Sequence, residues 1–328
     1  MFTFPQARYT LLEQPTPLAP LARLEKRLGR SGLFIKRDDH MPIALGGNKL
    51  RSLEFWLGAA LEEGADVLLV AGAPVSNQCR LTAAAAAIAG LDCVIIHNDA
   101  ETAQSLRSSY LNRIFGAEVR FVGSISEESR AVRIEEIAEE LRAVGRRPYI
   151  VGSAVIGALG YAMAALELLT QVRESGSPIR HVILPGSMGP TEAGFTFGNA
   201  LLGHPFDVHL VSVEYGQADL AARIARIFGE LQHFVGASEV QLDDARIHYH
   251  MDYLGPGYAL PTPEGENAIL TLARTEGILL EHTYTAKPFA GFMDMATDGS
   301  IDPSEGLCFL HTGGVPTLFV QDQLFQTI

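Results

Sequence analysis

The feature that most constrains the fold of this chain is a regular alternation of short apolar segments with longer, helix-forming ones. Segments with the length and character of strands lie at Val67–Ala71, Cys93–His97 and Glu118–Val122. Comparable segments recur later, at Val182–Leu184, Val208–Val213 and Leu307–Leu310. Apolar strands separated by helices are typical of parallel sheets that are covered on both faces. The sequence therefore predicts an α/β protein built on open parallel sheets with flanking helices.

The segments between the early strands are predicted to be helices, at Ser76–Ala89, Thr102–Phe115 and Glu127–Val144. With 328 residues the chain is too long for one simple core, and it suits two lobes or one large α/β unit. No long linker rich in proline, glycine or serine divides it, and it contains no repeat. Any second domain must therefore be interwoven with the first.

Composition excludes some classes of protein. Hydrophobic residues make up 47% of the chain and charged residues 19%, which is typical of a globular protein. The chain has 25 Lys and Arg against 38 Asp and Glu, a net charge of −13. So acidic a surface does not neutralise phosphates, which argues against general nucleic-acid binding.

The three cysteines, Cys79, Cys93 and Cys308, indicate neither a disulfide framework nor a CxxC metal site. The N-terminal sequence MFTFPQARYT has no basic stretch followed by an apolar core, so we do not expect a secretory signal. The apolar run Leu81–Gly90 is too short to span a bilayer. We therefore expect a cytoplasmic protein that does not enter the membrane.

The first motif with chemical potential is Gly46-Gly47-Asn48-Lys49, which precedes a predicted helical segment at Leu53–Leu61. Two glycines before a lysine let the backbone approach a ligand closely. An amine becomes a useful nucleophile when its pKa is lowered, and burial or the positive end of a helix has that effect. The alternative is an ordinary surface lysine after a loop, because this motif alone has little specificity.

Two further motifs lie where a strand leads into a helix. Ser76-Asn77-Gln78 follows the first predicted strand, and Ser76 is a good helix N-cap, while Asn77 and Gln78 can present donors to an anion. Gly186–Gly194, with the sequence GSMGPTEAG, is a small-residue loop of the kind that binds phosphate through backbone N–H groups. It matches neither a Walker loop nor a dinucleotide fingerprint.

A fourth motif, His311-Thr312-Gly313-Gly314, follows the last predicted strand. Thr312 can hydrogen-bond a ring nitrogen or cap a helix. The segment His248–His250 has two histidines but no HExxH pattern or carboxylate partner, so we expect no metal site. Gly152–Gly160 is interpreted as a place of close helix packing or a loop beside a cofactor.

Together the four motifs resemble one family, the fold-type II pyridoxal-phosphate (PLP) enzymes of the D-cysteine desulfhydrase and 1-aminocyclopropane-1-carboxylate (ACC) deaminase group. The resemblance runs in one order from Pro15 to Pro316, over nearly the whole chain. It implies a two-lobed fold like that of the tryptophan synthase β subunit, with PLP as cofactor and a small amino acid as substrate. It also implies a small domain at 53–161, a large PLP-binding domain made of 1–52 and 162–328, and a homodimer.

The resemblance further implies roles for individual residues. Lys49 resembles the lysine that carries PLP as a Schiff base, Asn77 the partner of the PLP phenolic oxygen, and Thr312 the partner of the pyridine nitrogen. The implied cofactor-binding residues are Lys49, Asn48, Asn77, Met188, Gly189, Thr191, Tyr284 and Thr312. The implied catalytic residues are Lys49, Ser76, Tyr258 and Tyr284. The implied substrate-binding residues are Ser76, Asn77, Gln78 and Tyr258.

Three positions bear on the reaction. ACC deaminases resemble one another in having Glu and Leu where this chain has Thr285 and Thr312, so these positions follow the desulfhydrase pattern. Gln78, by contrast, resembles the deaminases. We therefore expect α,β-elimination from a small amino acid, with D-cysteine giving pyruvate, hydrogen sulfide and ammonia. The alternatives are ring-opening deamination of ACC, elimination from a related β-substituted amino acid, or a non-catalytic PLP-binding protein.

Some residues depart from the family pattern. Val75 replaces the usual Gln, Pro190 removes an N–H from the phosphate loop, and 152–155 lacks the Gly-Gly-Ser-Asn of many relatives. These changes surround the expected site of the substrate carboxylate. The resemblance thus indicates the cofactor more sharply than the substrate.

Overall fold

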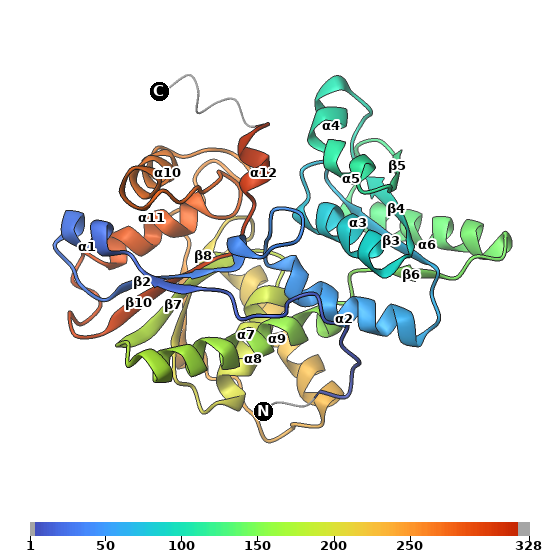
Figure 1. Cartoon of the computed structure of the whole chain (residues 1–328). Helices are drawn as coiled ribbons and strands as arrows, with labels where there is room; N and C mark the ends of the chain where they lie inside the picture. Colours follow the sequence, from blue (N-terminus) through green and yellow to red (C-terminus); the bar gives the residue numbers. More distant parts are fainter. Residues whose placement is uncertain (1–3, 321–328) are drawn as a thin grey trace.

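The structure, a computed structural model, describes residues 4–320, which form two sheets flanked by helices (Figure 1). The larger sheet has six strands in the order β1-β2-β10-β7-β8-β9. β1 is antiparallel to β2, and every other neighbouring pair is parallel. The strands are β1 Leu18–Pro20, β2 Leu33–Arg37, β7 Ile179–Gly186, β8 Asp207–Ser212, β9 Ile247–His250 and β10 Gly306–His311.

The smaller sheet has four parallel strands in the order β5-β4-β3-β6. They are β3 Val67–Gly72, β4 Asp92–His97, β5 Glu118–Phe121 and β6 Pro148–Ile150. In Figure 1 this sheet and its helices lie on one side of the molecule, and α2 begins near the middle of the view and runs below the smaller sheet. The helices of this part are α2 Lys49–Glu62, α3 Asn77–Ala89, α4 Ala103–Ser108, α5 Tyr110–Ile114 and α6 Glu127–Ala143. The prediction of an α/β protein with parallel sheets and flanking helices is confirmed.

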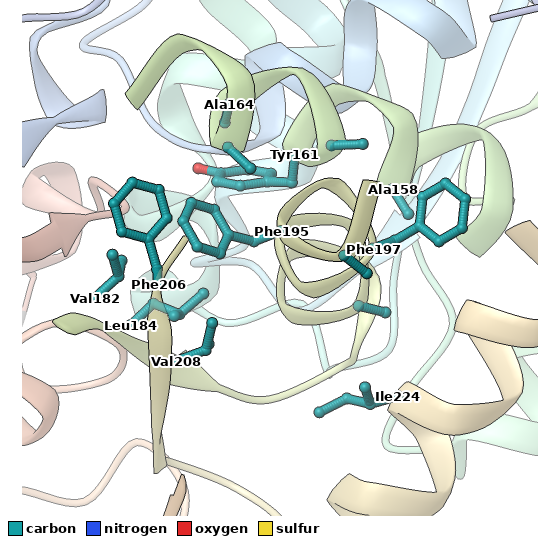
Figure 2. Packing of buried hydrophobic residues seen from close by; sticks show 14 of the residues in the cluster. Ala158, Tyr161, Ala164, Val182, Leu184, Phe195, Phe197, Phe206, Val208 and Ile224 are labelled. Carbon is teal, nitrogen blue, oxygen red and sulfur yellow. The ribbon is translucent and has the colours of Figure 1, made fainter. Parts of the chain in front are cut away.

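Helices cover both faces of the larger sheet. Alternate strand residues such as Val182 and Leu184 pack against the α7, α8 and α9 side, while Ile183 packs against the α1, α10 and α11 side. Figure 2 shows aromatic rings such as Phe195 and Phe206 filling the first of these interfaces. The remaining helices are α1 Ala22–Leu28, α7 Ala154–Ser175, α8 Pro190–Leu201, α9 Gln217–Val235, α10 Pro263–Glu276, α11 Ala286–Met295 and α12 Val315–Leu318, with short 3₁₀ turns at Asp38–His40 and Asp244–Arg246.

Glycines let α7 approach its two neighbours closely. A Cβ atom on Gly160 would lie 2.2 Å from the Arg51 carbonyl oxygen of α2. A Cβ atom on Gly194 of α8 would lie 2.1 Å from the Ala158 carbonyl oxygen. The interpretation of the segment ending at Gly160 as a region of close helix packing is therefore confirmed.

Helix α7 is also long and apolar enough to cross a membrane by length and composition, with a mean hydropathy of 1.5. Of this window, 56% is buried inside the protein, and its contacts with α2 and α8 identify it as a core helix.

One predicted helix is broken. The segment Thr102–Phe115 forms α4 and α5, which are separated at Ser109. The Ser109 hydroxyl donates to the Ser105 carbonyl oxygen at 2.8 Å, and such local bonding competes with regular helix. The strands of the smaller sheet fall within 53–161 and those of the larger sheet outside it, while α2 and α7 cross the two boundaries. The division into domains at these residues stays a prediction.

Candidate active site

Lys49 is the first residue of α2, and a tightly folded loop leads into it. Gly46 and Gly47 have φ angles of +68° and +125°, which glycine adopts readily. A Cβ atom on Gly46 would lie 2.2 Å from the Asp39 carbonyl oxygen, so no larger residue fits there. The loop thus explains why two glycines precede the lysine.

The structure brings the other three motifs to this loop. The Asn48 backbone N–H donates to the Thr312 carbonyl oxygen at 2.9 Å, and the Asn48 side-chain amide donates to the Thr191 hydroxyl at 3.0 Å. Arg80, one turn after Asn77, donates to the Gly46 carbonyl oxygen at 3.3 Å. Segments that are more than 260 residues apart in the chain therefore meet around Lys49.

The electrostatic surroundings of Lys49 favour a neutral amine. Burial lowers the pKa of Lys49, and the carboxyl groups of Glu192 and Glu214 offset part of this effect. Its Nζ atom makes no hydrogen bond to any residue between 4 and 320. A partly buried amine with no acceptor of its own is suited to covalent attachment of a ligand.

The second motif presents polar groups at the start of α3. The Ser76 hydroxyl accepts from the Cys79 backbone N–H at 3.4 Å, which confirms Ser76 as the N-cap. Asn77 is buried, and its Oδ1 atom accepts from Arg80 at 2.7 Å, so its NH₂ group is left to donate elsewhere. Gln78 lies beside the loop at Gly152, where an added Cβ would be 3.9 Å from Nε2.

The third motif forms the turn between β7 and α8. Gly189 has φ +105° and is the N-cap residue of α8, and Pro190 occupies the first helical position. Thr191 is buried, whereas Met188 is 38% exposed and its sulfur accepts from the Tyr215 hydroxyl at 3.3 Å. Backbone N–H groups at such a turn suit a phosphate group.

Two carboxyl groups flank this turn, and the sequence reasoning missed both. The Glu192 side chain is buried and accepts from the Ser187 backbone N–H. Glu214 accepts from the Ser187 hydroxyl at 2.6 Å. Burial raises the pKa of Glu192 above its usual value. The sequence gives no sign that Glu192 belongs to a site, because acidic residues are common in the first turn of a helix, where they interact favourably with the helix dipole.

The two predicted tyrosines form a pair. The hydroxyls of Tyr258 and Tyr284 are hydrogen-bonded to each other, and the ring centroids are 5.8 Å apart. Burial and the neighbouring Tyr258 raise the pKa of Tyr284 well above its usual value. The Tyr284 hydroxyl therefore keeps its proton at neutral pH.

Glu281, also missed from the sequence, organises the loop that carries Tyr284. It is fully buried, and its carboxyl group accepts from the backbone N–H groups of Thr283 at 2.8 Å and Tyr284 at 2.7 Å. The Thr285 hydroxyl accepts from the Glu281 backbone N–H at 2.9 Å. Thr285, one of the two positions that follow the desulfhydrase pattern, is thus hydrogen-bonded within this loop.

The fourth motif turns sharply after β10. The Thr312 hydroxyl makes no hydrogen bond within the described part of the chain, and the N-cap of the following helix is Gly314. Thr312 is therefore not used as a helix cap, and its hydroxyl remains available to a ligand. His248–His250 lie in β9. Among residues 4–320 no group of three or more His, Cys, Asp or Glu side chains is placed to hold a metal ion.

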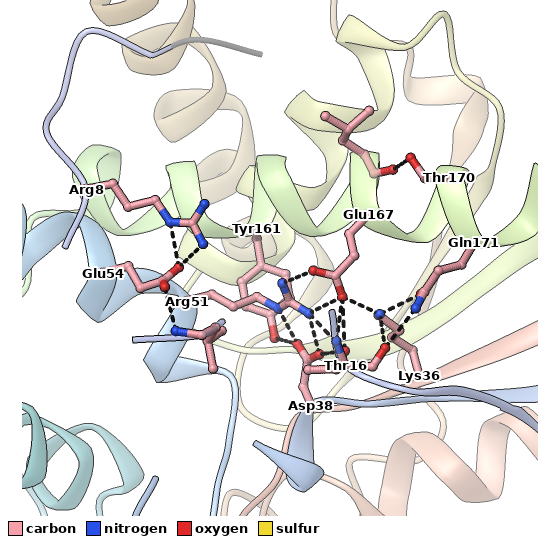
Figure 3. Close-up of polar contacts among 12 residues, drawn as sticks. Arg8, Thr16, Lys36, Asp38, Arg51, Glu54, Tyr161, Glu167, Thr170 and Gln171 are labelled. Carbon is pink, nitrogen blue, oxygen red and sulfur yellow. Dashed lines mark hydrogen bonds and ion pairs between the residues drawn. The ribbon is translucent and has the colours of Figure 1, made fainter. Parts of the chain in front are cut away.

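A buried ionic network holds α2 in place behind Lys49 (Figure 3). Arg51 donates to both oxygens of Asp38 at 2.8 Å and to Glu167 of α7 at 2.9 and 3.0 Å. The Tyr161 hydroxyl donates to Asp38 at 2.6 Å, and Lys36 contacts Glu167. The network joins β2, α2 and α7, so it fixes the direction of the helix that begins at Lys49.

The residues present fit a phosphorylated aldehyde cofactor. Among residues 4–320 the Lys49 amine makes no hydrogen bond, and Asn77 and Thr312 leave polar groups uncommitted. The hydrogen bond from Asn48 to Thr191 brings this lysine to a small-residue turn with backbone N–H groups. The family profile described as pyridoxal-phosphate dependent enzyme matches residues 9–313. The chain belongs to this family of PLP enzymes.

Within this family the chain is similar to D-cysteine desulfhydrases. It is 39% identical to the protein of Klebsiella pneumoniae over 320 residues, and 38% identical to that of Salmonella typhi over 321 residues. Each alignment covers 95% of both proteins. These likenesses agree with the resemblance read from the four motifs.

Solved structures support the same placement. The crystal structure of an ACC deaminase homologue superposes with a TM-score of 0.88 at 32% identity, covering 99% of this chain and 97% of that one. An L-serine ammonia-lyase from Rhizomucor miehei shares the fold with a TM-score of 0.69 at 19% identity, covering 95% of this chain and 98% of that one. The fold prediction is confirmed.

Proposed function

We propose that this protein is a lyase that removes the β-substituent and the amino group of a small amino acid, with D-cysteine as the first choice of substrate. The products from D-cysteine would be pyruvate, hydrogen sulfide and ammonia. The observation that carries the proposal is that the loop of Lys49 is hydrogen-bonded to the segments of Thr191, Thr312 and Arg80. The similarity to D-cysteine desulfhydrases over 95% of the chain supports the choice of reaction.

The chain's own groups divide the task of holding PLP. Lys49 would hold the cofactor covalently, and the turn Met188–Thr191 would hold its phosphate. Asn77 would donate to the phenolic oxygen, because its Oδ1 is already occupied by Arg80 and its NH₂ group is not. Thr312 would meet the ring nitrogen with its uncommitted hydroxyl. When bound, PLP supplies the electron sink for negative charge at the substrate α-carbon.

Three groups would act on the substrate. Lys49 is suited to take the α-proton, because burial lowers the pKa of its amine and increases the neutral fraction at a given pH. Tyr258 and Tyr284 share one hydrogen bond and hold their protons, so one of the two hydroxyls would donate a hydrogen bond to the leaving sulfur. Ser76 and Gln78, at the start of α3, would orient the substrate carboxylate, where helix N–H groups favour an anion.

ACC deamination is the second candidate. Gln78 favours it, as does the similarity to an ACC deaminase homologue at 32% identity. Thr285 and Thr312 disfavour it by the family pattern. A non-catalytic PLP-binding protein is the third candidate, and the retained Lys49 and tyrosine pair weigh against it. We also propose a homodimer in the cytoplasm, with no nucleic-acid partner.

The deciding experiment compares substrates on the PLP-loaded protein. D-cysteine, L-cysteine and ACC are supplied separately, and pyruvate, sulfide and 2-oxobutyrate are measured, with Lys49→Ala as the inactive control. The proposal expects pyruvate and sulfide in equal amounts from D-cysteine, and little product from ACC. Preferential release of 2-oxobutyrate from ACC would support the second candidate, and no turnover of any substrate would support the third.

A further inference from the structure

The turn that would hold the PLP phosphate already contains a carboxyl group. Glu192 is the third residue of α8, and only 2% of it is exposed. Its carboxyl group accepts from the Ser187 backbone N–H and also faces the N–H groups of Gly189 and of Glu192 itself. These donors belong to the same turn as the proposed phosphate site. A carboxyl group and a phosphate group would therefore draw on one set of donors.

Few charges are available to compensate a second anion here. On the α2 side Lys49 is the cation that acts on Glu192, and burial lowers the pKa of its amine, so its positive charge is a weak partner for a second anion. Glu214 lies just after β8 and accepts a hydrogen bond from the Ser187 hydroxyl. Besides burial, its negative charge also raises the pKa of Tyr258 and Tyr284.

Helix α9 brings one cation near the turn. The Cβ of Arg223 would lie 3.6 Å from a Cβ placed on Gly189. Its guanidinium, however, lies over the Tyr215 ring, 4.1 Å from the ring centroid. The α7 side presents backbone and apolar groups to α8, including the carbonyl oxygens of Ala158 and Ala162. The turn thus holds a buried carboxyl group in surroundings that offer little compensation for a neighbouring phosphate.

We propose that Glu192 forms part of the phosphate site and takes up a proton when the phosphate group of PLP binds. This inference rests on the proposed function, since it assumes that the turn holds PLP. A protonated carboxyl group does not repel the phosphate, and it can donate its O–H to a phosphate oxygen. Burial already favours the neutral form of Glu192, as the raised pKa of this group indicates.

The consequence is a coupling between pH and cofactor affinity. Where Glu192 is ionised in the free protein, binding must take up a proton, so affinity falls as pH rises. The fall approaches about tenfold per pH unit, the limit for one coupled proton. Glutamine at this position is neutral at every pH and keeps the size of the side chain, so Glu192→Gln should abolish the coupling.

The test counts protons by calorimetry. The full-length protein, freed of cofactor, is titrated with PLP at pH 8 in two buffers of different ionisation enthalpy. Pyridoxal, which has the aldehyde but no phosphate, is titrated in parallel, and subtracting it cancels the protons exchanged at Lys49. Glu264→Gln is the matched control, because Glu264 is exposed in the first turn of α10, a helix that also begins with proline.

We expect the wild type to take up about one proton more with PLP than with pyridoxal, and Glu192→Gln to lose this excess. At pH 8 the variant should bind PLP more tightly than the wild type, with unchanged affinity for pyridoxal, and the difference should grow with pH by up to about tenfold per unit. If the wild type takes up the same number of protons with PLP as with pyridoxal, the inference is overturned, even if the variant does not fold. Equal behaviour of the wild type and a folded Glu192→Gln variant also overturns it. A wild type that binds no PLP would instead refute the proposed function.

Discussion

Arg51 gives the sharpest test of how α2 is held in place. We predict that Arg51→Met destabilises the protein by about 3–5 kcal/mol, the usual cost of removing one partner from a buried ion pair. The Arg51 side chain is 5% exposed and its main partner Asp38 is 0% exposed. Burial disfavours the charged guanidinium, yet the carboxylates of Asp38 and Glu167 outweigh burial and raise the pKa of Arg51 well above its usual value.

The magnitude follows from what the substitution leaves behind. Asp38 would keep the hydroxyls of Thr16 and Tyr161 as donors but lose the guanidinium that pairs with it directly. Glu167 would keep Lys36. One buried carboxylate is therefore left with only the more distant charge of Lys36, while the other remains directly paired. This places the expected loss toward the lower part of the range, at about 3 kcal/mol.

The matched control is Arg226→Met, which removes an exposed pair. Arg226 pairs with Glu230 at 2.8 Å, and the two side chains are 56% and 42% exposed, so its loss should cost about 0–1 kcal/mol. Both variants are measured by equilibrium urea unfolding with PLP absent, so that cofactor binding does not contribute. Equal midpoints for the wild type and Arg51→Met would refute the account of the network.

Three further outcomes are expected. Thr191→Ala should weaken PLP binding about tenfold to a hundredfold, while Thr191→Ser should retain most of the affinity, as measured by fluorescence titration. An unchanged PLP affinity in Thr191→Ala would place the phosphate elsewhere. Burial and adjacent histidines lower the pKa of His209 from 6.5 to about 2, so its contribution to stability is complete above pH 6.5 and is lost as the pH falls toward 2. The stability of His209→Asn, measured by urea unfolding, should therefore fall less steeply than that of the wild type between pH 6.5 and 4. Parallel curves of stability against pH for the two proteins would contradict this. Burial raises the pKa of Cys79 to about 11 and of Cys308 to about 12, so a thiol reagent at pH 7.5 should label neither in the folded protein, and rapid labelling would be inconsistent with the structure.

The sequence predicted those parts of the fold and site that depend on short, continuous sequence patterns. Strands such as Val67–Ala71 form continuous apolar runs, and parallel sheets bury such runs on both faces. Gly46 and Gly47 come shortly before Lys49, and two glycines before a lysine let the backbone approach a ligand closely. Because the strands are parallel, the turns after them lie at one end of the sheet, so the meeting of Thr191 and Thr312 near Lys49 follows from the strand pattern.

Groups that act through distant partners could not be predicted in this way. Arg51 and Glu167 are 116 residues apart, and each alone resembles a surface charge on a helix. Glu281 precedes Tyr284 by three residues, but its role depends on the loop turning its backbone N–H groups inward. The break at Ser109 depends on a side-chain hydrogen bond that competes with the helix, which helical periodicity does not reveal.

The central claim is that Lys49 carries PLP, and reduction of the loaded protein with borohydride tests it most directly. The other lysines are Lys26, Lys36 and Lys287. Lys36 is committed to the Thr16 carbonyl oxygen and Gln171 at 2.7 Å each, and Lys287 to the carbonyl oxygens of Leu254 and Gly257 at 2.8 and 2.7 Å.

Digestion and mass spectrometry then locate the reduced label. The account predicts one pyridoxyl-phosphate group per chain, on the peptide that contains Lys49, and no label at that position in Lys49→Ala. Recovery of the label on Lys36 or Lys287 in the wild type, or an undiminished amount of label in Lys49→Ala, would contradict it.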